Sequence, residues 1–182
     1  MKFETNLPPS LREVAEAVRR DWGRDRSVIV CGSTHDGEES LLLDLLKDLS
    51  KQFPQTLLVL APRHPERFDQ AARLTVRSGF NMARRSQQPG PIPDAVSVQI
   101  ADTMGELAML YAAADIAIVG GSLIRIKGIG GHNILEPCAV GVPVIFGPYM
   151  RNFSEISQLV LSRQAGFQID GIETLQAQVC TL

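Results

Sequence analysis

The sequence has few cysteines and no excess of charge of one sign. Its three cysteines, Cys31, Cys138 and Cys180, are widely spaced and form no CxxC pair, which argues against a disulfide framework and a zinc-binding cluster. We therefore expect a reducing compartment. The net charge is −2 and no basic patch stands out, so nucleic acid is not an expected partner.

Long hydrophobic runs are also lacking. No apolar run approaches the roughly 20 residues that span a bilayer, and the N-terminus has no charged-then-apolar signal pattern. We therefore expect the chain to be soluble by itself. Apolar residues make up 45% and charged residues 21% of the 182, an ordinary globular composition, and this length predicts one domain over residues 1–182.

Short apolar runs alternate with amphipathic segments along the chain. The expected strands are 27–30, 56–61, 80–83, 96–100, 116–119, 142–146 and 166–169. The expected helices are 11–22, 38–52, 68–76, 104–111 and 153–163, with a short one after Pro137. Strands that alternate with helices need crossover connections, which are right-handed within one sheet. The pattern predicts an α/β fold with a doubly wound, parallel, Rossmann-like sheet.

The stretch from Asp115 to Ile145 is rich in glycine and reads DIAIVGGSLIRIKGIGGHNILEPCAVGVPVI. An apolar strand gives way to two glycine clusters and then to a short segment that looks helical. Glycines between a buried strand and a helix let the backbone approach a ligand closely, and they leave N–H groups pointing at it. We interpret this stretch as a ligand-binding loop.

The histidines fall where a ligand site is expected. Ligands of doubly wound sheets bind outside the carboxyl ends of the strands. The chain has three histidines, His35, His64 and His132, and each lies in a predicted strand-to-helix loop. The sequence therefore predicts that these loops form the binding edge of the sheet.

Two of these loops carry candidate groups for binding an anion. Gly32, Ser33 and Thr34 offer backbone N–H groups and hydroxyls to a phosphate or a sugar carboxylate, or they simply cap the next helix. Arg63 and His64 lie between two prolines directly after a strand, and an arginine there can pair with a phosphate or carboxylate in bidentate fashion. A surface arginine beside a capping histidine is the alternative.

Two further segments fit either helix capping or ligand binding. Asp102 and Thr103 supply a cap and Glu106 an acidic first turn, which by local physics is a helix start. Asn133 and Glu136 have the N-x-x-E spacing of a capping box. In the functional alternative, Glu136 accepts hydrogen bonds from a ribose diol while loop N–H groups hold a phosphate. The spacing does not separate these alternatives.

Several well-known motifs are absent from the sequence. No Gly-Lys-Ser/Thr closes a Walker A loop, no G-x-G-x-x-G follows the first strand, and no G-x-S-x-G elbow occurs. No cluster of histidine, cysteine and carboxylate has metal-ligand spacing. We therefore expect no cofactor and no metal.

Seven motifs, taken together and in order, resemble the C-terminal half of 3-deoxy-D-manno-octulosonic acid (Kdo) transferases. They are GSTHDGEE at 32–39, APRHPERF at 61–68, RRS at 84–86, DTMGELAMLY at 102–111, GGS at 120–122, GGHNILEP at 130–137 and FGPYMRNFSEI at 146–156. Lys2-Phe3 also resembles the end of the segment that enters this half in the family. The motifs cover nearly the whole chain.

The resemblance implies the donor-binding domain of a GT-B glycosyltransferase. Such an enzyme has two Rossmann-like domains and uses CMP-Kdo to place Kdo on lipid A precursor, in lipopolysaccharide synthesis at the cytoplasmic face of the bacterial inner membrane. Carried over by position, the implied contacts are Arg63 and His64 at the charged part of the donor; Met104, Gly105 and Glu106 along the nucleotide; Ser122, Gly131, His132, Asn133 and Glu136 at phosphate and ribose; and Ser33 and Thr34 facing the interdomain cleft.

The resemblance also assigns two parts to an N-terminal half that is absent here, namely the catalytic carboxylate and the membrane-anchoring segment. We therefore expect no catalytic residue in this chain and no sugar transfer by it alone. Lipid A precursor and the membrane are expected partners of the full-length protein only. The loop between Ser122 and Gly130 is longer than the usual family pattern and brings in Arg125 and Lys127.

Two other functions stay open on the sequence. One is a GT-B transferase or epimerase that uses a uridine diphosphate sugar, which competition between CMP and UDP would distinguish. The other is a non-catalytic interaction or regulatory module whose glycines and caps serve structure. For that module no nucleotide would raise the melting temperature, because only a ligand of the folded state stabilises it.

Overall fold

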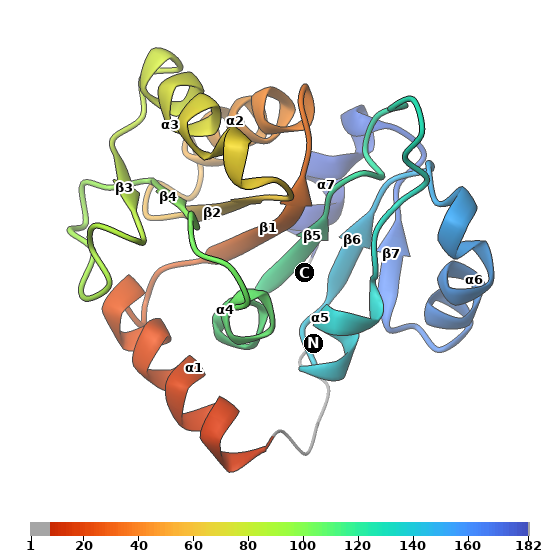
Figure 1. Cartoon of the computed structure of the whole chain (residues 1–182), viewed down its shortest axis with the longest axis horizontal. Coiled ribbons are helices and arrows are strands. Elements are labelled where there is room, and N and C mark those ends of the chain that lie inside the picture. The colour runs from red at the N-terminus through yellow and green to blue at the C-terminus, as the bar shows by residue number, and fades with distance from the viewer. Residues whose placement is uncertain (1–7, 182) are drawn as a thin grey trace.

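The computed structural model describes residues 8–181 (Figure 1), so that Lys2-Phe3 lies outside the described part. In this part seven strands form one sheet in the order β3-β4-β2-β1-β5-β6-β7, and every neighbouring pair is parallel. The strands are β1 (Val28–Thr34), β2 (Leu57–Pro62), β3 (Met82–Arg84), β4 (Val98–Ile100), β5 (Ile116–Val119), β6 (Val144–Phe146) and β7 (Gly166–Gln168). The predicted doubly wound parallel sheet is confirmed.

Helices cover both faces of the sheet (Figure 1). One face packs against α1 (Pro9–Trp22), α4 (Leu107–Ala113), α5 (Leu135–Ala139) and α6 (Ser154–Ser162). The other packs against α2 (Glu38–Leu49), α3 (Phe68–Arg77) and α7 (Leu175–Cys180). Short 3-10 turns, η1 (Pro65–Arg67), η2 (Arg151–Phe153) and η3 (Ile172–Thr174), precede three of these helices. None of the described helices is long and apolar enough to cross a membrane.

The strands are apolar because both faces of the sheet are buried. In β1, Val28 and Val30 join the core on the α1 side, whereas Ile29 and Cys31 join the core on the α2 side. All four are nearly or completely buried. Fully burying an aliphatic side chain of this size stabilises a fold by about 1.5–3 kcal/mol, so β1 anchors both layers at the centre of the sheet.

The first strand is longer than the sequence predicted. β1 continues to Thr34 because Thr34 pairs with Pro62 of β2, after an irregularity at Ser33, whose φ is 56°. The next helix begins only at Glu38, and its N-cap is Gly37 in the left-handed conformation, without a side-chain cap. The prediction that Ser33 and Thr34 sit at a helix start is therefore wrong.

The predicted cap of the fourth long helix is also wrong. α4 begins at Leu107 without a side-chain cap, so Asp102 and Thr103 lie well before it. The Asp102 carboxylate instead accepts hydrogen bonds from the Ser86 backbone N–H and from Nε of Arg84, both at 2.8 Å. Asp102, which follows β4, therefore binds both the last residue of β3 and the loop after it.

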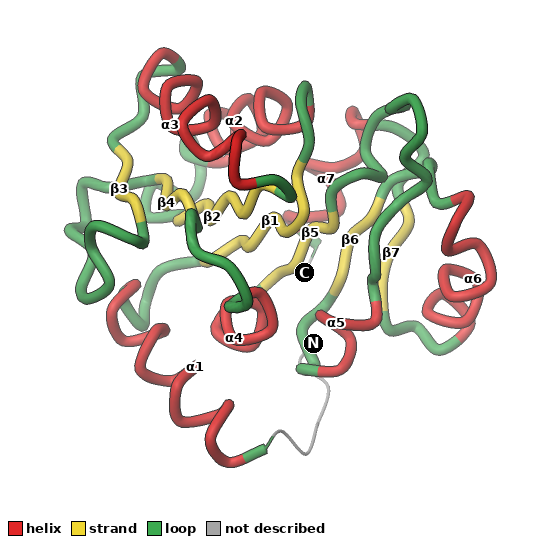
Figure 2. The backbone as a smooth tube through the Cα atoms, in the orientation of Figure 1, coloured by secondary structure: helices red, strands yellow, loops and turns green. Residues whose placement is uncertain are grey.

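The direction of winding reverses between β1 and β5, which lie side by side in the sheet. The chain builds β2, β3 and β4 on one side of β1 and β5, β6 and β7 on the other. The loops that follow β1 and β5 meet at this point (Figure 2), where the Gly120 backbone N–H donates to the Gly32 carbonyl at 2.8 Å. Crevices at such reversals are the usual ligand sites of doubly wound sheets.

Candidate functional site

A cleft of about 380 Å³ opens at the carboxyl ends of the central strands. Its size lies within the range of small-molecule sites. Residues at the ends of β1, β2 and β4, residues of α4 and the segment that leads into α5 form its walls. Its polar lining residues are Ser33, Arg63, Thr103, Tyr111, His132, Asn133 and Glu136. Its remaining lining is Ala61, Pro62, Ala101, Met104, Gly105, Leu107, Leu110 and Phe153.

The cleft carries a cation and a carboxylate on different walls. Arg63 follows β2, and its backbone N–H donates to the Thr34 carbonyl at 2.9 Å, which fixes the start of this loop. Glu136 lies in the first turn of α5 and is exposed. Asn133 accepts the backbone N–H of Leu135 at 3.0 Å and therefore stabilises that turn. A guanidinium can bind phosphate or carboxylate, and a carboxylate can accept from a diol.

All three histidines of the chain gather beside the cleft. Nε2 of His35 lies 2.6 Å from Nε2 of His132, and the two rings stack with centroids 4.9 Å apart. The His64 ring lies edge-on to His35, with centroids 5.6 Å apart. Burial lowers the pKa of His35 and lowers the pKa of His132 to about 4, with nearby cationic side chains adding to both effects. Both rings are therefore neutral at pH 7, so one Nε2 donates and the other accepts.

A buried carboxylate joins the two central loops. Glu38 opens α2 and is fully buried. One of its oxygens accepts the backbone N–H groups of His35 at 3.0 Å and Gly121 at 2.8 Å, and the other accepts the N–H of Leu123 at 3.0 Å. Burial raises the pKa of Glu38. Because it holds the loops after β1 and β5 together, Glu38 sets the position of the histidine pair.

Close backbone contacts shape the loop that follows β5. The Ser122 hydroxyl donates to the Val119 carbonyl at 2.5 Å and accepts the Gly147 N–H at 2.9 Å. A Cβ at Gly147 would lie 2.0 Å from the Ser122 carbonyl oxygen, and one at Gly131 would lie 2.5 Å from Sδ of Met150. Backbone packing therefore requires glycine at 147, and a φ of 90° favours glycine at 131.

The fold and the sequence of this chain are similar to those of a solved protein domain. No family model matches the chain. A solved structure, the C-terminal CMP-Kdo binding domain of WaaA from Acinetobacter baumannii, superposes with a TM-score of 0.82 at 32% identity, covering 91% of this chain and 84% of that one. The chain belongs to the Kdo transferase family. The predicted family and the predicted Rossmann-like, GT-B C-terminal fold are thereby confirmed.

Curated relatives agree with the assignment to the Kdo transferase family. The 3-deoxy-D-manno-octulosonic acid transferase of Haemophilus influenzae is 38% identical over 170 residues, which are 93% of this chain and 39% of that protein. The enzyme of the same name from Bordetella pertussis is 37% identical over 177 residues, or 96% of this chain and 40% of that protein. The chain thus spans about two fifths of the length of these relatives.

The structure brings seven of the twelve predicted donor residues to one cleft. Ser33, Arg63, Met104, Gly105, His132, Asn133 and Glu136 all line it. They come from four separate segments of the chain, so their meeting reflects the parallel sheet and not their order in the sequence. Their roles in this Kdo transferase family member stay predictions. Among the described residues, no three histidine, cysteine, aspartate or glutamate side chains are placed to hold a metal ion.

Five predicted residues lie outside the lining of the cleft. Thr34, Ser122 and Gly131 are buried, and the Thr34 hydroxyl donates to Glu39, so these three support the loops behind the cleft. The Glu106 carboxylate is bound by Arg85 and by the Thr103 hydroxyl. His64 is exposed and packs on His35. The Thr34 side chain has no exposed surface, so it does not face the interdomain cleft as predicted.

Sequence reasoning missed three residues that line the cleft without belonging to the sheet. Tyr111 looks like a core residue of an amphipathic helix and is indeed almost fully buried, yet it reaches the cleft. A Cβ at Gly32 would lie 2.0 Å from its hydroxyl, so Gly32 makes room for this side chain. Thr103 and Phe153 also line the cleft. The signal that was available is their position within the family motifs at 102–111 and 146–156.

The buried histidine pair predicts a dependence of stability on pH. An unfolded histidine takes up a proton near pH 6.5, whereas folded His132 does so only near pH 4. The unfolded state therefore binds more protons between these values, and the free energy of unfolding should fall as the pH is lowered through this range. Urea titrations at several pH values should show a loss about 2 kcal/mol larger for wild type than for His132→Gln, allowing for solvent screening.

The matched control is Gln176→Ala, which replaces an exposed side chain of α7 that carries no titratable group. It should keep the wild-type slope of stability against pH. Parallel slopes for wild type and His132→Gln would show that His132 is protonated in the folded protein as readily as in the unfolded chain.

Proposed function

We propose that this chain binds CMP-Kdo and serves as the donor half of a Kdo transferase. One observation carries the proposal: Arg63 and Glu136, from loops far apart in the sequence, line the same cleft together with His132 and Asn133. The solved relative from Acinetobacter baumannii, of which this chain covers 84%, is a CMP-Kdo binding domain. Both the site and the relationship therefore point to a nucleotide sugar as the ligand.

Each wall of the cleft suits a different part of this donor. The exposed Arg63 guanidinium suits the phosphate or the Kdo carboxylate, because it can bind either in bidentate fashion. Glu136 suits the ribose, because its carboxylate can accept hydrogen bonds from both ribose hydroxyls. Met104 is 62% exposed beside Gly105, which has a φ of 79°, and offers an apolar surface to the base. In this arrangement His132 borders the phosphate, where neutral imidazole can donate or accept.

The activity of the whole protein is part of the same proposal. The chain forms one nucleotide-sugar domain over residues 1–182, and an N-terminal half would supply the catalytic carboxylate and the contact with the membrane. The full-length enzyme would then place Kdo on lipid A precursor at the cytoplasmic side of the bacterial inner membrane. Transfer by this chain alone is not expected, because the catalytic carboxylate would come from that N-terminal half.

Calorimetry with CMP tests the donor site. The chain should bind CMP, and Glu136→Ala should weaken binding by about tenfold to a hundredfold, because hydrogen bonds to a charged group contribute about 1.5–3 kcal/mol. The control is Glu155→Ala on α6, which removes an exposed carboxylate outside the cleft. That variant should bind CMP as wild type does.

Competing ligands separate this proposal from its alternatives. UDP should displace CMP only weakly, and a clear preference for UDP would assign the site to a different nucleotide sugar. The absence of any binding at millimolar CMP, together with an unchanged melting temperature, would favour an interaction module.

A further inference from the structure

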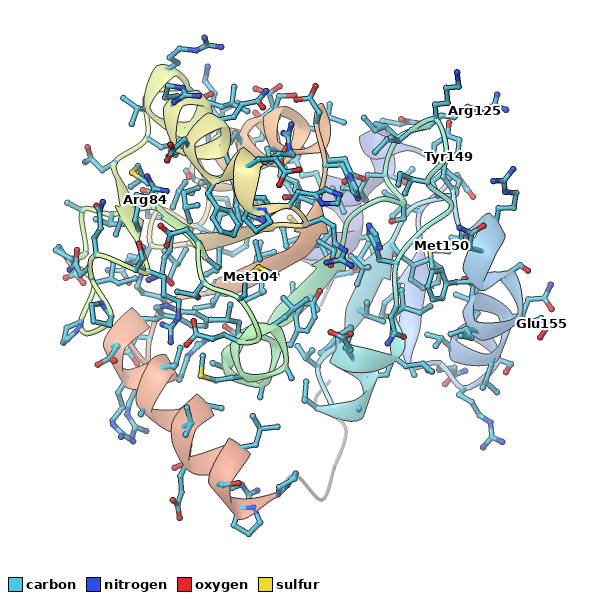
Figure 3. The ribbon with its side chains drawn as sticks, in the orientation of Figure 1. Arg84, Met104, Arg125, Tyr149, Met150 and Glu155 are labelled. Atoms are coloured by element: carbon cyan, nitrogen blue, oxygen red, sulfur yellow. The ribbon has the colours of Figure 1, made fainter. Side chains whose placement is uncertain are left out.

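A second hollow lies on the other side of the loop that carries His132. We call it the basic groove. It measures about 840 Å³, more than twice the volume of the donor cleft, and the two share no lining residue. Its walls are the long loop after β5, the residues after β6 and one side of α6. Arg125 lies on that loop near its tip, with Tyr149 below it and Met150 further in (Figure 3).

The charge of the basic groove has one sign. Arg125, Lys127 and Arg151 line it, and no aspartate or glutamate does. Within residues 8–181, none of these three side chains forms an ion pair or a side-chain hydrogen bond. Other arginines of the chain are neutralised, such as Arg19 by Asp115 and Arg85 by Glu106, both within 2.7 Å. The groove therefore concentrates uncompensated positive charge in a chain whose net charge is −2.

Apolar side chains lie among these cations. Ile126 and Ile129 alternate with the basic residues of the loop, and Leu161 of α6 faces them across the groove. Tyr149 and Leu161 keep 38% and 36% of their surface exposed. A surface that combines basic and apolar side chains suits an amphiphile with an anionic head. The groove has no carboxylate in the place that Glu136 takes in the donor cleft.

Backbone hydrogen bonds hold the groove in shape. The Asn152 N–H donates to the Gly130 carbonyl at 2.9 Å, and the Tyr149 N–H donates to the Ser122 carbonyl at 3.1 Å. The Ile129 N–H closes a turn onto the Ile126 carbonyl at 3.2 Å. The basic side chains therefore project from an ordered frame, which lowers the entropy cost of binding a ligand.

We propose that the basic groove binds the phosphate-bearing headgroup of an anionic lipid. The arginines would take the phosphate oxygens in bidentate fashion and Lys127 would add a compact charge. The apolar side chains would contact the glycerol or acyl carbons next to the head. This proposal does not depend on CMP-Kdo binding, because the donor cleft is formed by other residues. A lipid held here would present its head beside the donor cleft, across the segment 130–133.

Sedimentation with lipid vesicles tests the proposal. The probe is phosphatidylcholine vesicles that contain phosphatidic acid, whose head is a phosphomonoester, compared with vesicles of phosphatidylcholine alone. Wild type should sediment with the former only. The combined variant Arg125→Gln, Lys127→Gln, Arg151→Gln should bind on the order of a hundredfold more weakly, since each basic residue near an anionic surface contributes about fivefold.

A charge-matched variant makes the test specific. Arg12→Gln, Arg20→Gln, Arg77→Gln removes the same charge from exposed positions on α1 and α3. It should keep vesicle binding within a few-fold of wild type, and calorimetry with CMP should be unchanged in both triple variants. Equal losses in the two triple variants would overturn the proposal, as would no vesicle binding by a folded wild type. A rise in the melting temperature of wild type on adding pyrophosphate, without any vesicle binding, would assign the groove to a soluble phosphate. That result would overturn the proposal of a lipid ligand.

Discussion

Glu38→Ala is expected to lower the free energy of unfolding by about 3 kcal/mol or more. The carboxylate is fully buried and accepts three backbone N–H groups, those of His35, Gly121 and Leu123. Truncation leaves these donors buried without an acceptor, and each such loss costs about 1–3 kcal/mol. The gain from no longer burying a carboxylate offsets only part of this. Urea unfolding followed by circular dichroism measures the change.

Two variants define how Glu38 acts. Glu38→Gln keeps the shape and one acceptor oxygen, so it should lose less stability than Glu38→Ala. Glu13→Ala removes an exposed glutamate from α1 and should change stability by no more than about 0.5 kcal/mol. A loss below about 1 kcal/mol for Glu38→Ala would mean that the loops after β1 and β5 hold their positions without this carboxylate.

Gly147→Ala is expected to destabilise the protein by at least about 3 kcal/mol. The added Cβ would lie 2.0 Å from the Ser122 carbonyl oxygen, 2.5 Å from its carbon and 2.7 Å from Cα of Leu123. All three are backbone atoms, so no side chain can rotate away and the loop after β5 must shift as a whole. The Gly147 N–H would then lose its bond to the Ser122 hydroxyl. Thermal unfolding by calorimetry measures the effect.

Gly90→Ala is the control for this prediction. Nothing lies within 4 Å of a Cβ at Gly90, and its φ is not positive. The substitution should leave stability within about 0.5 kcal/mol or raise it slightly, because alanine restricts the unfolded chain. A wild-type melting temperature for Gly147→Ala would show that the contact between the two loops is loose.

The apolar pattern of the sequence was enough to predict the sheet but not its order. The predicted and observed bounds agree for β5 at 116–119, because a strand buried on both faces is apolar throughout. The predicted first strand stopped too early because residues 31–34 look like a polar loop. Their pairing with β2 is a contact between distant segments, which local residue types do not encode. The order β3-β4-β2-β1-β5-β6-β7 depends on such contacts alone.

The site was predicted from position and from family motifs together. Loops at the carboxyl ends of parallel strands converge, and this rule predicted that the histidines share one edge of the sheet. The structure places His35 and His132 in contact there. Glu38 could not be found this way, because an acidic residue in the first turn of a helix is usually solvated and merely favours the helix dipole. Only the packing of the loop after β5 makes it a buried acceptor. Thr34 was misassigned for a related reason. Its hydroxyl donates to Glu39, and both side chains are fully buried, so the hydroxyl is not available to a ligand.

The central position of β1 has a consequence for the order in which the chain folds. One edge of β1 pairs with β2, the next strand in the sequence, but the other edge pairs with β5, which follows only after three further strands. Closing that longer loop costs more chain entropy and is slower. Until it closes, β1 presents an edge of unpaired N–H and C=O groups between apolar side chains, which is a template for pairing with another molecule. The interval between β1 leaving the ribosome and β5 arriving is therefore the period when this chain is most exposed to aggregation.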